Sequence, residues 1–115
     1  MPENIKPFDE LLFFAQVKKR PGAHLGVPSL LSFRDQLFGM MYAFSFCYQE
    51  TPLRYFNEFV QWYHNEVLPD KNGYACWWNH LLYTSGNMDE LAFYDFFRCF
   101  ESWLLEHHNI RLPDL

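Results

Sequence analysis

Two side chains with metal-binding chemistry, Cys76 and His80, stand four residues apart in a segment of helical character. Residues at i and i+4 share one face of a helix, so these two could ligate the same ion. A structural zinc site takes four such ligands, and the neighbouring sequence adds no pair with diagnostic spacing. The distant candidates are His64, Cys99, His107 and His108. A packed cysteine beside a half-exposed histidine explains the pair better, and we expect no metal and no cofactor.

Nucleophilic catalysis by a cysteine and a histidine is a second chemistry that the residue types allow. The chain has three thiols, Cys47, Cys76 and Cys99. A catalytic thiol needs an electropositive, partly exposed setting, whereas Cys47 and Cys99 stand among Phe and Tyr residues. Their number is odd and they form no CxxC pair, which favours reduced thiols in a cytoplasmic protein. We therefore expect no enzymatic activity.

The charge of the chain is unevenly distributed. Residues 50–115 hold ten Asp or Glu against four Lys or Arg, a net −6, while residues 1–49 carry +1. Nucleic-acid binding normally needs a basic face, so an acidic half argues against it. The same half suits a basic protein partner. The alternative is that the carboxylates only keep an aromatic-rich domain soluble.

Acidic and aromatic side chains of the second half form the candidate surface for a basic partner. Carboxylates steer a cationic protein, and exposed tryptophans are common anchors of interfaces. Trp77 and Trp78 cannot point the same way on a helix, because adjacent residues are about 100° apart. The residues that we expect to bind are Glu58, Glu66, Asp70, Asp89, Glu90, Asp95, Trp62 and Trp78. The alternative is a solvated acidic face above a core that holds every aromatic ring.

A basic cluster, KKR at residues 18–20, opens a connector rich in proline and glycine. Three cations could bind phosphate or anionic lipid, but they also suit the negative C-terminus of a preceding helix, which is the simpler interpretation. Pro21 and Pro28 prevent a regular helix from running through the stretch. Gly22 and Gly26 can adopt positive φ at no steric cost. The stretch is predicted to be a shaped connector between two helices.

The composition indicates one domain that spans residues 1–115. Half of the residues are hydrophobic (50%) and 21% are aromatic, which is enough to build a core without disulfides or metal. The N-terminus is polar and resembles no signal peptide. Runs of 18 or more apolar residues do not occur, so we expect no membrane span and a cytoplasmic location.

Helical periodicity predicts five helices joined by short connections: Phe8–Val17, Leu30–Gln49, Pro52–Val67, Ala75–Thr84 and Met88–His107. The second, which starts after the N-cap Ser29, is apolar nearly all round and is therefore predicted to be the most buried. Gly39 is expected to let another helix approach it closely. No strand signal of weight occurs. The expected fold is an all-α, compact bundle of about five helices around a buried aromatic-rich second helix, with antiparallel neighbours.

Capping signals set the expected ends of these helices. Thr51 and Pro52 read as an N-cap followed by proline at the first helical position. Gly86 is expected to cap a helix C-terminus. Asn87, with Glu90 three residues later, resembles a capping box at the start of the last helix.

A series of motifs follows the chain in a recognisable order. A helix with a basic end is followed by RPG at 20–22 and LGxxSL at 25–30, and then by a long aromatic helix. FxxFxxWY at 56–63, the Trp77-Trp78 pair and AFxxFF at 92–97 come next. This order, over about residues 11–104, resembles small all-α bacterial proteins found beside polymorphic toxins. Some of these act as immunity proteins of contact-dependent growth inhibition.

The resemblance implies a protein that binds and neutralises one cognate toxin domain, by blocking its active site, and that catalyses nothing. Many toxins of such systems are basic nucleases, so acidic side chains of this chain could stand in for phosphates. Direct contact with nucleic acid or membrane is not implied. The alternative is a helical adaptor or homo-oligomeric interaction protein, for example a homodimer, whose excess aromatics lie in a symmetric interface.

Overall fold

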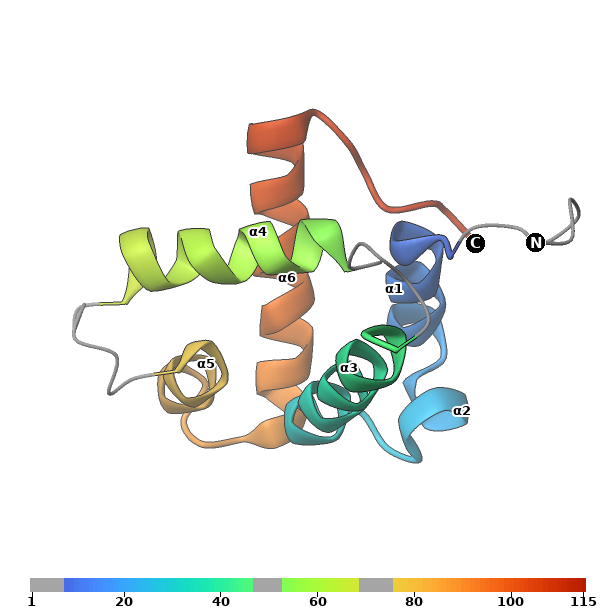
Figure 1. Cartoon of the computed structure of the whole chain (residues 1–115). Helices are drawn as coiled ribbons and strands as arrows, with labels where there is room; N and C mark the ends of the chain where they lie inside the picture. The colour runs from blue at the N-terminus through green and yellow to red at the C-terminus, as the bar shows by residue number, and fades with distance from the viewer. Residues whose placement is uncertain (1–7, 47–52, 69–75) are drawn as a thin grey trace, which may run out of the picture.

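The computed structural model describes residues 8–46, 53–68 and 76–115 (Figure 1). These ranges contain six α-helices and one π-helical turn, with no strand among them. The elements are α1 (Glu10–Lys19), α2 (Pro21–Leu25), α3 (Leu30–Phe44), α4 (Arg54–Trp62), η1 (Tyr63–Val67), α5 (Trp77–Thr84) and α6 (Asp89–His108). The predicted all-α bundle with an aromatic-rich core is confirmed.

The core is centred on α6, which contacts α3, α4 and α5. Its buried residues form a broad apolar stripe: Ala92, Phe93, Phe96, Phe97, Phe100, Trp103 and Leu104. The predicted central helix, residues 30–49, is α3 in its described part, and α3 buries only Leu30, Phe33 and Leu37. Its central position was therefore predicted wrongly. Rings on every side of a helix do not show which side the core will cover.

Aromatic rings join the other helices to α6. Phe14 of α1 is fully buried, with its ring centroid 5.0 Å from that of Phe100 and 5.5 Å from that of Phe33. Phe59 of α4 meets Phe96 and Phe100 edge-to-face, at 5.7 and 5.3 Å. Edge-to-face pairs of this kind stabilise a core beyond the area that they bury.

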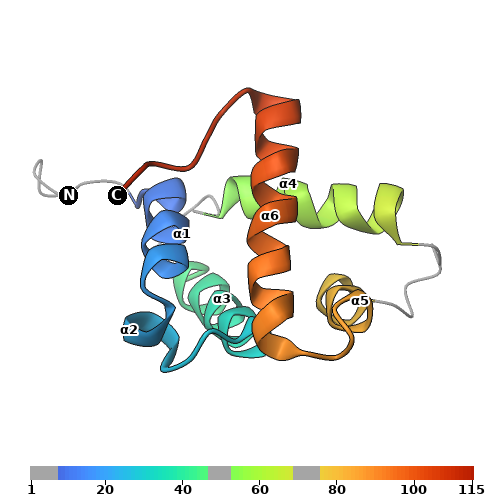
Figure 2. The same ribbon diagram turned by 180° about the vertical axis from the view of Figure 1, so that it is seen from behind.

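The expectation of antiparallel neighbours fits α1 and α6, which run in opposite directions in Figures 1 and 2, but not α4, which crosses α6. Figures 1 and 2 both show α4 lying across α6, with α5 beside the C-terminal part of α4 and α1 on the opposite side of α6. The large rings at the crossing hold the two helices in this orientation. No helix in the described ranges has the length and hydropathy needed to cross a membrane.

The connector between α1 and α3 contains one short helix, α2, which the sequence analysis did not predict. Proline is tolerated at the first position of a helix, so Pro21 starts α2 instead of preventing it. Gly26 ends α2 with φ 83°, in line with the expected positive φ, whereas Gly22 stays within the helix. The chain then extends to Ser29, whose side chain accepts a hydrogen bond from the N–H of Ser32 and caps α3 as predicted.

A compact turn joins α5 to α6. Gly86 has φ 68°, as the predicted glycine cap requires, and its N–H bonds to the carbonyl of Tyr83. The N–H of Asn87 bonds to the carbonyl of Leu82 at 2.7 Å, which completes a Schellman motif. Asn87 therefore adopts positive φ and belongs to the end of α5. The predicted capping box is wrong, because α6 follows Met88 without a side-chain cap.

Two other predicted boundaries also differ. The predicted start at Thr51 and Pro52 lies outside the described residues, and α4 begins at Arg54. Its first free N–H groups are bound by a side chain from elsewhere: Glu10 accepts from Tyr55 at 3.0 Å and from Phe56 at 2.7 Å. α3 ends at Phe44, before the predicted Gln49, a residue that is not described. Residues 63–67 continue α4 as a π-helical turn, for which the sequence carries no recognised signal.

Gly39 does not bring two helices of this chain together. It lies on the exposed side of α3, and a Cβ built there meets no atom within 4 Å in the described structure. The expected close approach of another helix is therefore absent from the described part of the molecule. Glycine inside an exposed helix costs about 1 kcal/mol relative to alanine, and no contact within the described chain accounts for that cost.

Candidate functional site

The described surface has a groove of about 400 Å³ between the C-terminal part of α4, α5 and α6. Figure 2 shows these three helices on one side of the molecule. We call it the Trp62 groove; its lining residues are Trp62, Leu81, Thr84, Asp95, Arg98, Cys99, Ser102, Trp103 and Glu106. The rings and the aliphatic side chain come from all three helices, so only the folded chain assembles this site.

Aromatic and aliphatic groups form the floor of the groove. Trp103 and Leu81 are 4% and 5% exposed, so they present only an edge to solvent. Trp62 is half-buried and is packed against the rings of Phe59 and His107, with centroids 6.0 and 5.8 Å away. Rings that are held in this way bind an incoming side chain without losing much conformational freedom. Trp62 is thus partly open to solvent at the edge of the groove.

Carboxylates stand on the rim of the groove. Asp95 accepts a hydrogen bond from Ser85 Oγ at 2.6 Å and is paired with Arg98, whose side chain is 79% exposed. Glu106 is exposed in the last turn of α6. Glu106 was not among the predicted residues, although a signal existed: Asp95, Ser102 and Glu106 are spaced i, i+7 and i+11, which places them along one face of a helix.

Two of the predicted binding carboxylates instead hold the fold together. Asp89 accepts hydrogen bonds from the hydroxyl of Ser29 and from the N–H of Leu31 at 3.1 Å, so it joins the start of α6 to the start of α3. Glu58 lies 2.7 Å from Nε2 of His108 and 3.6 Å from Nε of Arg54. Asp89 lies at the start of α6, and Glu58 contacts His108 at its end. About 28 Å of helix therefore separates these two carboxylates.

The remaining predicted residues lie on separate parts of the surface. Glu66 is exposed on η1, and Glu90 is exposed in the first turn of α6. Asp70 lies outside the described residues. Trp78 is half-buried against Phe38 of α3, while its neighbour Trp77 is in the core, as expected for adjacent residues about 100° apart on a helix. Of the seven predicted residues that the structure describes, the groove brings together only Trp62 and Asp95.

Two of the side chains considered for metal binding or catalysis, His80 and Cys99, lie in surroundings that suit neither chemistry. Nδ1 of His80 lies 2.6 Å from the hydroxyl of Tyr63, and burial raises the pKa of that hydroxyl. Burial also raises the pKa of the Cys99 thiol, which disfavours the thiolate that a nucleophile needs. Within the described ranges, no group of three or more His, Cys, Asp or Glu side chains could hold a metal ion. Cys47 is not described.

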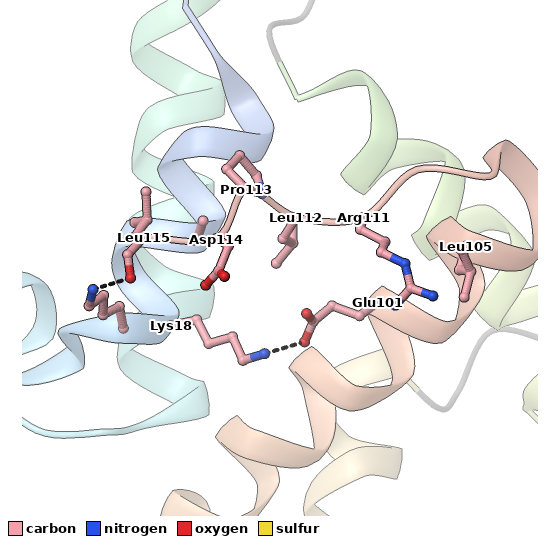
Figure 3. Close-up of a pocket in the computed structure, with 10 residues that line it drawn as sticks. Lys18, Glu101, Leu105, Arg111, Leu112, Pro113, Asp114 and Leu115 are labelled. Carbon is pink, nitrogen blue, oxygen red and sulfur yellow. Dashed lines mark hydrogen bonds and ion pairs between the residues drawn. The ribbon is translucent and has the colours of Figure 1, made fainter.

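The basic cluster at the end of α1 borders a second cavity, of about 480 Å³, beneath the C-terminal segment. Figure 3 shows Lys18 paired with Glu101 of α6, at 2.7 Å. The ammonium of Lys19 donates a hydrogen bond to the main-chain oxygen of Leu115. Both lysines lie in the last turn of α1, where the helix dipole favours cations. These contacts support the structural interpretation of the cluster over that of a phosphate site.

The Trp62 groove therefore combines fixed rings with carboxylates in an acidic chain, and this combination is suited to binding cationic side chains. Comparisons of the chain with protein-family models, with curated proteins and with solved structures find no match.

Proposed function

We propose that this protein is a non-catalytic binding protein that neutralises a cognate toxin domain by covering its active site. The observation that carries the proposal is the Trp62 groove, in which the half-buried ring of Trp62 and the buried ring of Trp103 adjoin the carboxylates of Asp95 and Glu106. The toxin domain is a basic protein, such as a nuclease. A lysine or arginine of that domain enters the groove, stacks on Trp62 and pairs with Glu106, because Asp95 is already paired with Arg98.

The distribution of charge supports a basic partner. Residues 50–115 carry a net −6, and they include the helices that form the groove. An acidic surface of this kind accelerates association with a cationic protein, and added salt slows that association. In our proposal the acidic side chains occupy the basic surface on which the toxin would otherwise bind its own anionic substrate.

We propose a cytoplasmic location for this neutralisation. Cys76 and Cys99 are both free thiols, which agrees with a reducing compartment. An incoming toxin domain would then meet its inhibitor in the compartment that contains the toxin's substrate.

We expect Glu106→Lys to weaken binding to the toxin domain encoded by the adjacent reading frame by at least tenfold. The change reverses one rim charge beside the proposed cationic contact, and loss of a close charge pair costs about 2 kcal/mol or more. Isothermal titration calorimetry against a catalytically inactive form of that domain, at low and at high salt, measures the change.

Glu90→Lys is the matched control, because it makes the same charge reversal on the same helix but outside the groove. It should alter the affinity by less than threefold at high salt, where long-range attraction is screened. Equal weakening by both variants would contradict the groove as the contact site, although not neutralisation itself.

A further inference from the structure

The outward face of α3 and the turn after it carry exposed aromatic rings that no described part of the chain covers. Phe38, Tyr42 and Phe46 are 44%, 72% and 74% exposed. Figure 1 shows α3 at the near side of the molecule with no helix over it. At about 200 Å² for each ring, these three expose close to 400 Å². The largest apolar patch on a typical monomer has about this size, and such a patch often has a binding role.

The rings on this face are already held in place. Tyr42 and Phe46 meet edge-to-face with centroids 5.2 Å apart. Phe38 meets Trp78 of α5 in the same way at 5.5 Å, and the guanidinium of Arg34 lies over that indole. Because these side chains have lost much of their freedom in the monomer, a partner that contacts them pays a smaller entropy cost.

Small residues beside the rings leave a low strip on this face, which we call the hollow. Gly39 and Ala43 are both exposed, and they stand one turn apart in the same stripe. A Cβ at Gly39 would meet nothing within 4 Å in the described chain, so the glycine leaves open space there. Positions 39, 42 and 46 are spaced three and four residues apart, as are the residues along the contact line between two packed helices. The face therefore holds projecting rings and a hollow that could receive a ring.

The charge on this face distinguishes among possible occupants. Residues 36–46 contain no Asp, Glu, Lys, Arg or His, and the charges of Arg34 and Asp35, just before them, are paired at 2.8 Å. A basic toxin domain would find no carboxylate here. Two copies of this chain, each with a net charge of −5, could meet on this face without bringing like charges together.

We propose that two copies of this protein associate through the α3 faces, with a two-fold axis between antiparallel α3 helices. In a two-fold interface each surface meets its own copy, so projecting rings and hollow must occur on the same patch, as they do here. Tyr42 and Phe46 of one copy then pack over Gly39 and Ala43 of the other. The interface is smaller than the roughly 800 Å² per partner of a standard one, so we expect micromolar affinity. The proposal does not depend on the toxin.

Sedimentation velocity of the full chain, from low to several hundred micromolar, tests this association. We expect a concentration-dependent monomer–dimer equilibrium in the wild type. Gly39→Gln should weaken it at least tenfold, because the new side chain fills the hollow. The monomer should keep its fold, because glutamine is a better helix former than glycine and meets open space there.

Tyr42→Glu provides a second test, because it places a charge on each side of the two-fold axis, and it should leave the protein monomeric. Tyr83→Glu is its matched control: Tyr83 is 77% exposed on α5 and lies outside the α3 face, so dimerisation should persist. A wild type that remains monomeric throughout the concentration range would overturn the proposal. So would a dimer that withstands both Gly39→Gln and Tyr42→Glu.

Discussion

Phe96→Ala is expected to lower the free energy of unfolding by about 3–5 kcal/mol, the usual cost of deleting a buried phenyl ring. Phe96 is fully buried at the centre of α6. Its ring meets those of Phe14 from α1, Phe59 from α4 and Trp77 from α5, with centroids 5.5 to 6.4 Å away. The cavity would thus remove contacts from three helices at once.

Urea denaturation followed by circular dichroism measures this loss, with Tyr94→Ala as the control. Tyr94 lies on the same helix but is 44% exposed, so its truncation should cost less than about 1 kcal/mol. A domain of ordinary stability, about 5–15 kcal/mol, would be left marginal by the Phe96 change. Similar losses in the two variants would contradict the placement of the core around α6.

Glu10→Ala is expected to cost about 2–4 kcal/mol, although it deletes a charged residue. Glu10 is 6% exposed, and its two carboxylate oxygens accept from the N–H groups of Tyr55 and Phe56. Removing the acceptor leaves two donors at the start of α4 without a partner, at about 1–2 kcal/mol each. Asp35→Ala, at an exposed carboxylate on α3, should change the stability by less than about 0.5 kcal/mol.

The pH dependence of stability gives a second readout of Glu10. Burial raises the pKa of this carboxyl above the ordinary 4.5, against the opposing effect of its backbone hydrogen bonds. The folded state therefore holds the proton more tightly than the unfolded state does. This contribution to stability is complete below pH 4.5 and is lost as the pH rises through the folded-state pKa. In Glu10→Gln this part of the pH dependence should disappear, and an unchanged profile would contradict the buried carboxyl.

The sequence predicts most helices of this fold but not which of them is central. Helical periodicity places α6 within one residue at each end, and Gly86 ends α5 as expected. α3 and α6 are both rich in aromatic residues, and their composition does not show which stripe faces the core. The sequence near α4 does not predict where this helix starts either, because its first N–H groups are capped by Glu10, more than 40 residues earlier.

The binding site was less predictable than the fold. A carboxylate that the helical pattern places on the surface can still form hydrogen bonds or ion pairs within the molecule. Asp89 and Glu58 bind groups on α3 and α6 that are 50 or more residues away in the chain. Only the tertiary structure brings these partners together. Trp62 and Asp95 meet in one groove for the same reason, since α4 and α6 approach through rings whose pairing has no sequence signal.

Neutralisation is tested most directly by assaying the activity of the toxin domain from the adjacent reading frame while this protein is added in increasing amounts. The proposal predicts that activity falls to the background at one equivalent, and that Glu106→Lys shifts the titration to higher concentration. A toxin domain that keeps full activity in the presence of excess protein would contradict the proposal.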